Sequence, residues 1–235
     1  MQITMIGHST VLIESNGQKL VTDPYFGTWG QIAYKRLAPP ARTREALRDV
    51  DAVLVSHNHW DHTDNGYLRQ LSDRVPVLAP QRMAWALKLR GAKNVVGLSP
   101  WRSHNLEAIT VTAVPALHIT LAVGYVIQAG DKRIYFAGDT YYRPFMAEIG
   151  KRFHLDAALI PVTTFRLPMT MGEKSAVRAV QALNPAAVVP IHLAVTPRSP
   201  LLRTGDTPQG FERRLRQAGL ETPVVLLREG ESWTA

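Results

Sequence analysis

The chain of 235 residues is 46% hydrophobic, which is enough apolar material to bury a large core. It contains no cysteine, which excludes structural disulfides, a cysteine nucleophile and thiolate ligands for a metal. The formal net charge is +8, but the basic residues are scattered without a stripe of interleaved aromatic residues, so no nucleic-acid partner is expected.

Targeting and membrane segments are not expected in this chain. No stretch approaches the apolar length of a transmembrane helix, and residues 1–6 lack the basic and continuous apolar regions of a signal peptide. No internal repeat, low-complexity tract or long linker divides the sequence. We therefore expect a cytoplasmic protein with a single domain over residues 1–235.

Three short strands are expected at the start of the chain, and Asn16-Gly17 is a strong hairpin signal between the second and third. The first break contains His8, and the third strand ends at Asp23. Two roles remain open for His8, which could line a site or pack in the core. Asp23 is expected to orient a metal-binding imidazole from behind. The expected strands cover residues 2–7, 10–15 and 18–22.

An irregular segment rich in Gly, Pro and aromatic residues follows, over residues 25–42. Long irregular segments of this kind often cover a functional site. Its aromatic side chains could hold a substrate or could form a small core of the loop itself. These aromatic residues are Tyr25, Phe26, Trp29 and Tyr34.

The most informative stretch is Ser56-His57-Asn58-His59-Trp60-Asp61-His62, which places four metal-competent side chains within six residues. It follows residues 51–56, an apolar and β-branched run that is typical of a buried strand. In extended backbone His57 and His59 project to the same side, so both imidazoles can reach one ion. This spacing predicts half of a metal site.

The rest of the stretch is expected to turn toward a second ion. Thr63-Asp64 offers an N-cap for a helix over residues 66–71, and a turn at this point directs Asp61 and His62 away from the first ion. Nitrogen and oxygen ligands without cysteine favour Zn, with Mn or Fe as alternatives.

Three further ligand candidates stand where later strands are expected to end, namely His118, Asp139 and His192. They could complete the two half-built sites, because metal ligands commonly come from separate strand ends that meet in the fold. A carboxylate at such a position can bridge two cations through its two oxygens, which is the role expected of Asp139.

The remaining pattern has the order meander, βα units, meander, βα units. Two sheets that pack face to face with helices outside would accommodate this order, so an α/β fold is expected. The further strands are expected over residues 75–79, 94–98, 107–114, 122–128, 132–137, 156–161, 186–192 and 224–227. The further helices are expected over residues 81–90, 144–153, 172–183 and 207–218.

Over nearly the whole chain these motifs resemble the metallo-β-lactamase superfamily. The resemblance is carried by His57, His59, Asp61, His62, His118, Asp139 and His192. Other motifs are similar to a compact bacterial branch that includes ascorbate-6-phosphate lactonase-like and N-acyl-phosphatidylethanolamine phospholipase D-like proteins. They are Gly7-His8-Ser9-Thr10, Thr22-Asp23-Pro24, Gly138-Asp139-Thr140, Thr170-Met171-Gly172 and Pro190-Ile191-His192.

The resemblance implies a four-layer αββα sandwich of two mixed β-sheets flanked by helices, with the site at the joined edge of the sheets. It implies a hydrolase with two divalent metal ions, for which Zn is expected and Mn or Fe are alternatives. The nucleophile would be a metal-bridging hydroxide, with Asp61 orienting it and passing its proton onward. By position, one ion would be held by His57, His59 and His118, the other by Asp61, His62 and His192, and Asp139 would bridge them.

Three functional interpretations remain open. Arg166, Arg198 and Arg203 could bind phosphate in a bidentate fork, which favours a phosphodiester or a phosphorylated small molecule or lipid headgroup as substrate. The same arginines would also be ordinary on a solvated surface. The first alternative is a lactone or amide hydrolase of an uncharged substrate, and the second is a metal-stabilised binding protein without turnover.

Overall fold

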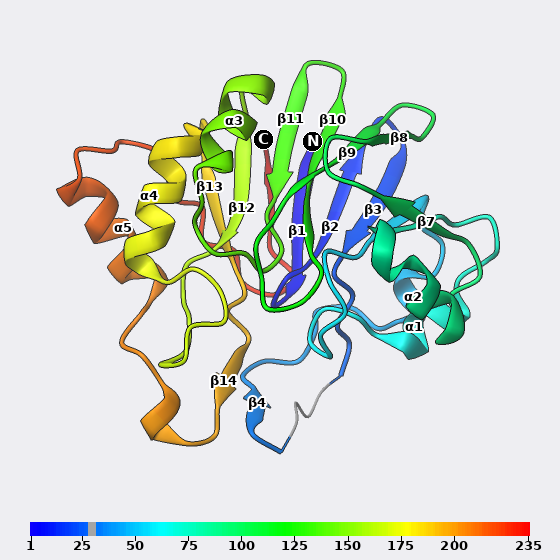
Figure 1. The fold of residues 1–235 in the computed structure, drawn as a ribbon, viewed down its shortest axis with the longest axis horizontal. Helices are drawn as coiled ribbons and strands as arrows, with labels where there is room; N and C mark the ends of the chain where they lie inside the picture. The colour runs from blue at the N-terminus through cyan, green and yellow to red at the C-terminus, as the bar shows by residue number, and fades with distance from the viewer. Residues whose placement is uncertain (28–31) are drawn as a thin grey trace.

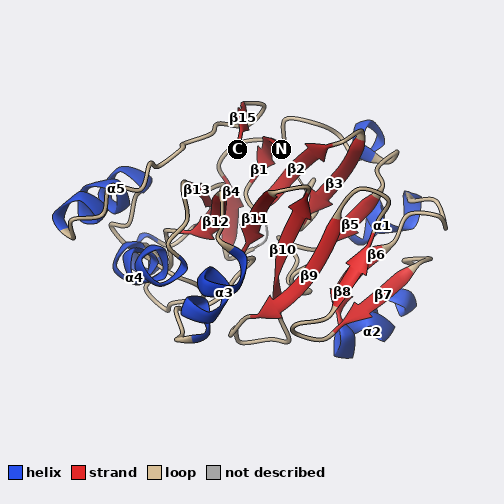
Figure 2. Cartoon of the chain, turned by 90° about the horizontal axis from the view of Figure 1, so that it is seen from above, coloured by secondary structure: helices blue, strands red, loops and turns tan. Residues whose placement is uncertain are grey.

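The computed structural model describes residues 1–27 and 32–235, so Trp29 lies outside the described residues. Two β-sheets pack against each other, and the helices cover their outer faces (Figure 1, Figure 2). The first sheet has the order β15 (Ser232–Thr234), β1 (Gln2–Gly7), β2 (Thr10–Ser15), β3 (Gln18–Thr22), β5 (Ala52–Leu54), β6 (Val77–Pro80) and β7 (Val95–Leu98). The second has the order β13 (Val188–Ile191), β12 (Ala157–Pro161), β11 (Lys132–Phe136), β10 (Val123–Ala129), β9 (Thr110–Pro115) and β8 (Ser103–Asn105).

The helices form the two outer layers, as Figure 2 shows. The first sheet is covered by α1 (Asn65–Gln70) and α2 (Ala84–Leu89), and the second by α3 (Phe145–Phe153), α4 (Glu173–Leu183) and α5 (Pro208–Gln217). A separate pair of strands, β4 (Tyr34–Arg36) and β14 (Val195–Pro197), projects from one end of the molecule (Figure 1). Among the described residues, no helix has the length and apolar character needed to span a membrane.

Three apolar clusters hold these layers together. Leu54 of the first sheet and Phe136 of the second belong to the cluster between the sheets. Leu87 of α2 belongs to a cluster on the outer face of the first sheet, and Phe211 of α5 to a cluster on the outer face of the second. Because each sheet is covered on both faces, its central strands are apolar throughout rather than alternating. The expected αββα architecture is therefore confirmed.

Parallel pairing brings the ends of several strands to one edge of the sandwich. In the first sheet β3, β5, β6 and β7 are parallel neighbours, and in the second β11, β12 and β13 are parallel neighbours. The carboxyl ends of parallel strands share an edge, so residues that directly follow them lie close together. This is the edge at which a ligand site is expected in such sheets.

Several local features agree with the sequence prediction. Asn16 and Gly17 both have positive φ, of 52° and 80°, as a two-residue type I′ turn requires. Asp64 caps α1, because its Oδ1 accepts a hydrogen bond of 3.1 Å from the backbone N–H of Tyr67.

The prediction of a closing strand over residues 224–227 is wrong. Only Val224 forms an isolated bridge there, to Val188, and the closing strand is β15, which pairs with the edge strand β1. Three residues of mixed polarity give no readable pattern, which is also why β4, β8 and β14 were not predicted. The expected helix over residues 81–90 is divided into a 3₁₀ turn, Gln81–Met83, and α2.

Candidate metal centre

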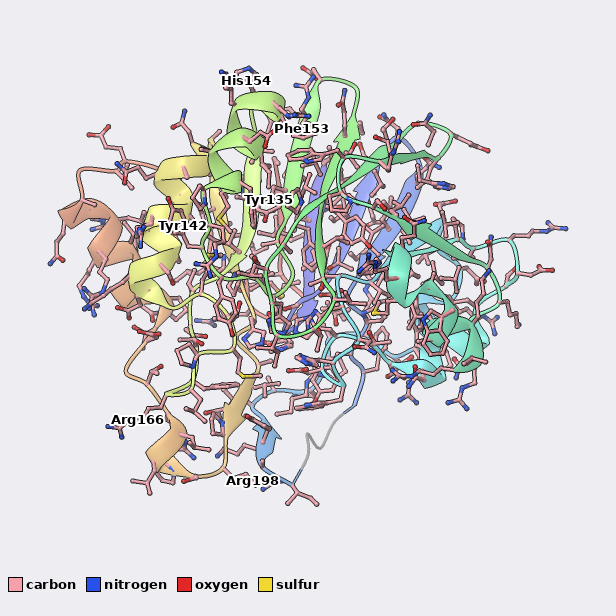
Figure 3. The ribbon with its side chains drawn as sticks, in the orientation of Figure 1. Tyr135, Tyr142, Phe153, His154, Arg166 and Arg198 are labelled. Atoms are coloured by element: carbon pink, nitrogen blue, oxygen red, sulfur yellow. The ribbon has the colours of Figure 1, made fainter. Side chains whose placement is uncertain are left out.

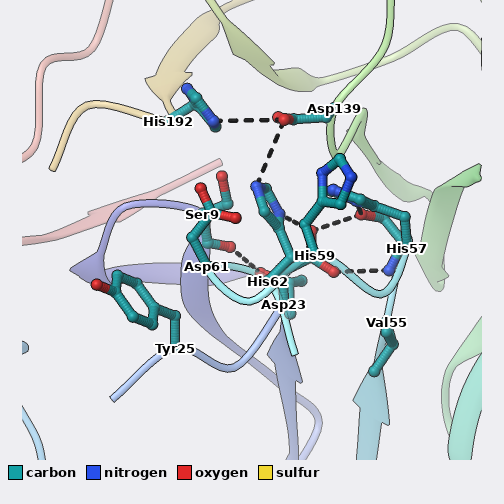
Figure 4. Close-up of polar contacts among 12 residues, drawn as sticks. Ser9, Asp23, Tyr25, Val55, His57, His59, Asp61, His62, Asp139 and His192 are labelled. Carbon is teal, nitrogen blue, oxygen red and sulfur yellow. Dashed lines mark hydrogen bonds and ion pairs between the residues drawn. The ribbon is translucent and has the colours of Figure 1, made fainter. Parts of the chain in front are cut away.

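The candidate site lies where the parallel strands of both sheets end (Figure 4). The strand β5 leads into the His57 motif, and β3 ends beside Asp23. From the second sheet, β11 leads to Asp139 and β13 to His192. His118 enters from the connection between β9 and β10. With the turn between β1 and β2, which carries His8, the fold brings together six separate segments of the chain.

The first group of ligand atoms comes from His57, His59 and His118, whose ligand atoms all lie within 4.8 Å of one another. The Nδ1 of His57 is 2.9 Å from the hydroxyl of Ser56, which leaves its Nε2 buried without a hydrogen-bond partner among the described residues. The Nε2 of His118 is 3.2 Å from the Nδ1 of His59, and the Nδ1 of His118 is also unpartnered. Buried unpaired nitrogens on converging imidazoles fit a bound cation.

The second group contains Asp61, His62 and His192, together with His8, again with ligand atoms within 4.8 Å of one another. His8 therefore lies in the site and is also fully packed, with its Nε2 3.4 Å from Oδ2 of Asp61. The sequence left these two roles open as alternatives. In the structure His8 has both roles, because it lies in the site and is packed in the core.

Asp139 lies against the second group. Its Oδ2 is 3.6 Å from Nε2 of His62 and 3.3 Å from Nε2 of His192, while its Oδ1 is buried without a hydrogen-bond partner in the described structure. One oxygen is thus directed at the second group, and the other is available for a cation.

Asp23 fixes the orientation of His62 from behind. Its Oδ1 accepts a hydrogen bond of 2.6 Å from the backbone N–H of Ser56, and its Oδ2 accepts one of 2.6 Å from the Ser56 hydroxyl. The same Oδ2 lies 2.7 Å from Nδ1 of His62, which turns the Nε2 of that ring toward Asp139. This geometry matches the orienting position that the sequence suggested for Asp23.

Three residues of the site adopt left-handed backbone conformations that non-glycine residues rarely take. The φ angles are 62° at His8, 31° at Asp23 and 64° at His192. His8 and His192 are also joined directly, because the N–H of His192 donates to the carbonyl of His8 at 3.0 Å. Such strained residues concentrate at functional sites, where the surrounding fold holds them in place.

Burial and neighbouring charges keep the first group of imidazoles neutral. Burial lowers the pKa of His57 well below its usual value, and burial lowers the pKa of His118 to about 4. Neutral imidazole is the form that binds a metal, so the first group is ready to accept a cation at neutral pH.

The second group holds a positive charge between carboxylates. Burial by itself would lower the pKa of His62, but the charges of Asp139 and Asp23 outweigh it and raise this pKa to about 10. For Asp139, burial opposes ionisation, yet His192 and His62 hold its pKa well below the usual range. The buried carboxylates therefore require a cation, and a divalent metal can replace the proton on His62.

A cavity of about 200 Å³ opens onto these groups. Its polar side is formed by His59, Asp61, Asp139 and His192, and its apolar side by Tyr34, Trp60, Phe165 and Met169. The ring of Tyr34 is centred 5.2 Å from that of Phe165 and 6.2 Å from that of Trp60. Tyr34 thus joins Trp60 and Phe165 into an aromatic wall on the apolar side.

The aromatic residues of the irregular segment divide between the two roles that the sequence left open. Tyr34 lines the cavity. Phe26 is buried in the core under the first sheet, with its ring 5.0 Å from that of Tyr67. Tyr25 is buried behind Trp60, at 5.4 Å between ring centres, and supports the wall from behind.

The structure does not bring the three candidate arginines into this cavity. Figure 3 shows Arg166 and Arg198 at the projecting end of the molecule, where both are exposed. The guanidinium of Arg203 donates to the backbone carbonyls of Pro197 and Arg198, at 3.0 and 3.1 Å. Among the described residues that line the cavity there is no Arg or Lys.

The sequence reasoning missed Phe165 and Met169, which follow β12 at the same edge of the sheet as His192. Their position after a parallel strand was the available signal, because that edge carries the site. Trp60 was inside the recognised motif but was not assigned to the cavity wall.

Comparisons with known proteins identify the family of the chain. A family model for the beta-lactamase superfamily domain matches residues 18–193. A UPF0173 metal-dependent hydrolase from Deinococcus radiodurans is 30% identical, covering 96% of both chains, and one from Methanopyrus kandleri is 28% identical, covering 99% of both. The isothiocyanate hydrolase from Delia radicum gut bacteria has the same fold, with a TM-score of 0.81 at 20% identity over 100% of this chain and 99% of that one. The chain therefore belongs to the beta-lactamase superfamily and is a metal-dependent hydrolase.

Proposed function

We propose that this hydrolase uses two metal ions. In this proposal His57, His59 and His118 bind the first ion, Asp61, His62 and His192 bind the second, and Asp139 lies between them. The observation that supports it most is the pair of ligand groups, each within 4.8 Å, that converge with unpartnered buried atoms on His57, His62, His118 and Asp139. Imidazole and carboxylate ligands favour Zn, and Mn or Fe remain the alternatives.

Two divalent cations in these positions would supply hydroxide at neutral pH and would polarise the reacting oxygen of the substrate. Asp61 belongs to the second ligand group and also lines the cavity, so it is placed to orient the nucleophile and accept its proton. His8 holds Asp61 in this position through the 3.4 Å contact. Asp23 and Ser56 keep the rings of His62 and His57 fixed, so that the site does not reorganise during the reaction.

The cavity favours an uncharged substrate of small size. Its apolar wall of Tyr34, Trp60, Phe165 and Met169 can bind an apolar group, while the polar side faces the bond to be cleaved. Apart from the proposed metal ions, no Arg or Lys among its described lining residues would compensate the charge of a phosphate. We therefore infer that a lactone, amide or similar neutral electrophile is the substrate class that the site accepts best.

A phosphorylated substrate is the second candidate. It is supported by Arg166, which directly follows the cavity residue Phe165 and could reach a group that extends beyond the cavity. It also fits the compact bacterial branch of lactonase-like and phospholipase D-like proteins that the motifs resemble. Both candidates use the same metal centre, so substrate profiling separates them.

Metal analysis by mass spectrometry tests the proposed centre. We expect about two ions per chain after supply of Zn, and a stoichiometry that never exceeds one would contradict the second ligand group. A binding protein without turnover would hold both ions but hydrolyse nothing.

A substrate panel on metal-replete protein tests the substrate class. It compares neutral lactones, amides and an aryl isothiocyanate with phosphodiesters and sugar-phosphate lactones. The isothiocyanate is included because the hydrolase from Delia radicum gut bacteria has the same fold. We expect the neutral compounds to have the higher kcat/KM. A preference for the phosphorylated compounds that added salt weakens would favour the second candidate instead.

A further inference from the structure

The end of the molecule beside the cavity carries an unusual combination of exposed apolar and basic side chains. We call this surface the basic tip and define it by three ranges, residues 32–37, 166–168 and 198–204. It includes β4 and the 3₁₀ turn Pro200–Leu202, and it projects below the sandwich in Figure 1. None of its residues is a ligand of the proposed metal centre.

Backbone contacts join the three ranges into one surface. The N–H of Arg198 donates to the carbonyl of Ala33 at 2.9 Å, and the N–H of Arg166 donates to the carbonyl of Leu202 at 2.9 Å. Arg203 forms a β-bridge with Phe165, which precedes Arg166. The pairing of β4 with β14 continues this ladder toward the sandwich. The basic tip is therefore a fixed structure rather than three separate loops.

Large aliphatic side chains of the basic tip point into solvent. Ile32 is 98% exposed, Leu201 74%, Leu167 70% and Leu37 58%. A single exposed leucine is ordinary, but several on segments that are joined to one another indicate a surface that binds something.

The charged side chains of the basic tip all have the same sign. Lys35, Arg166, Arg198 and Arg203 are exposed, and the three ranges contain no Asp or Glu. Arg203 donates its hydrogen bonds to carbonyls, which leaves its positive charge without a carboxylate partner in those contacts. The partner of this surface should therefore present anionic groups at its surface and apolar groups directly below them.

We propose that the basic tip docks on a membrane that contains anionic phospholipid. Cationic side chains attract the headgroups, and exposed aliphatic side chains insert beside the acyl chains, which is the combination that holds peripheral proteins on bilayers. A projecting structure suits insertion better than a flat protein interface. Nucleic acid fits less well, because the exposed apolar residues are aliphatic and offer no stacking surface.

Docking in this way would bring the cavity to the bilayer surface. Tyr34 of the cavity wall belongs to the basic tip itself, and Phe165 of the cavity wall directly precedes Arg166 of the tip, so the two surfaces are continuous. An apolar substrate dissolved in the membrane could then reach the cavity without crossing much water. The docking itself does not depend on the proposed chemistry, and it can be tested without a substrate.

Vesicle sedimentation with the full chain tests the proposal. The probes are phosphatidylcholine vesicles with and without phosphatidylserine, at low and at physiological salt. We expect binding to the anionic vesicles, weaker at the higher salt, and little binding to phosphatidylcholine alone. Arg166→Glu and Lys35→Glu should each lower the partition constant at least about fivefold, and Leu201→Glu about tenfold.

Matched controls come from α2, on a different side of the molecule in Figure 1. Leu89 is 77% exposed and Lys88 is exposed, so Leu89→Glu and Lys88→Glu make the same changes in charge and polarity away from the basic tip. The controls should bind as the unaltered chain does. Thermal unfolding of every variant separates a loss of binding from a loss of folding.

Three results would overturn the proposal. The first is absence of binding to anionic vesicles at low salt, and the second is binding that the tip variants and the α2 variants reduce equally. The third is a stable oligomer in analytical ultracentrifugation that Leu201→Glu dissociates, because the basic tip would then be an interface between copies of this chain.

Discussion

The Oδ2 of Asp23 lies 2.7 Å from the Nδ1 of His62, and both side chains are fully buried. Burial raises the pKa of Asp23, whereas its contacts with His62 and Ser56 favour the ionised form. Asp23 thus loses its solvation on folding but gains a fixed contact with a ring of the proposed metal centre. Partners of this kind set both the tautomer and the direction of the histidine that they contact.

Replacing Asp23 with Asn should weaken metal binding without preventing folding. Asn fits the same volume and tolerates the positive φ of 31° at this position. The amide lacks the negative charge that holds the Nδ1 proton of His62, so the affinity for the second ion should fall about 10- to 100-fold. Competition with a coloured chelator measures this loss. Equal affinities in both proteins would mean that Asp23 has only a structural role.

Asp139→Ala should remove one of the two proposed metal ions and abolish activity. It deletes the carboxylate that lies 3.3 Å from Nε2 of His192 and 3.6 Å from Nε2 of His62. In the proposed centre the second ion would then lose a ligand, and the two cations would lose their shared negative charge. We expect about one ion per chain by mass spectrometry and no measurable turnover. Retention of two ions would exclude the position of Asp139 between the metals.

Asp61→Asn should behave differently, because it removes the proposed proton acceptor but preserves shape. The first ligand group, His57, His59 and His118, does not include it and should keep its ion. The value of kcat should fall about 10²- to 10⁴-fold. Near-normal turnover would remove Asp61 from the proton path. The metal content of the same preparation shows whether any loss is due to chemistry or to a missing ion.

The sequence predicted the sandwich and the gathering of the ligand candidates because both depend on strong local signals. Strands covered on both faces, such as β5 and β12, are apolar throughout, and the residues that follow parallel strands meet at one edge. His57, His59, Asp61 and His62 are also adjacent in the chain, so their proximity required no tertiary information.

Features that depend on side-chain direction could not be predicted in this way. The sequence shows that Arg198 and Arg203 follow His192, but the ladder of β4 and β14 carries them away from the cavity. Phe165 enters the cavity, while its neighbour Arg166 points to solvent. The β-bridge between Phe165 and Arg203 fixes these opposite directions, and the sequence alone does not show that bridge. Short strands of this kind carry too few residues for a period of two to be recognised.

The metal-free protein should lose stability in mild acid. Burial, followed by the charge of His192, lowers the pKa of His8 to about 3, although Asp61 partly offsets this. In the unfolded chain the pKa of His8 is about 6.5. Between that pH and about pH 3 the unfolded state binds more protons than the folded state, so the stability of the fold falls as the pH falls. His62, with its pKa raised to about 10, has the opposite effect. The stability that it contributes reaches its full value only below about pH 6.5, so it offsets part of the loss of stability between about pH 7 and pH 5.

Urea unfolding of the EDTA-treated protein at two pH values measures this effect. At about pH 5 the free energy of unfolding should be lower than at about pH 7, with His8 alone contributing about 2 kcal/mol of the difference. The variant His8→Asn, which tolerates the φ of 62°, should show a smaller difference. An identical pH dependence in both proteins would mean that His8 does not remain neutral in the folded chain.

Phe165→Ala tests whether the aromatic wall selects the substrate. The ring of Phe165 is centred 5.2 Å from that of Tyr34 and 6.1 Å from that of His192, so it joins the apolar side of the cavity to the metal centre. Removing it should raise KM for a neutral aryl substrate about tenfold, through lost apolar burial, and should change kcat much less. A neutral substrate with only a methyl group should respond little. Phe153→Ala, on α3 at the opposite end of the molecule in Figure 3, is the control and should leave KM for both substrates unchanged. If Phe165→Ala affects both neutral substrates equally, the wall supports the metal centre rather than recognising the substrate.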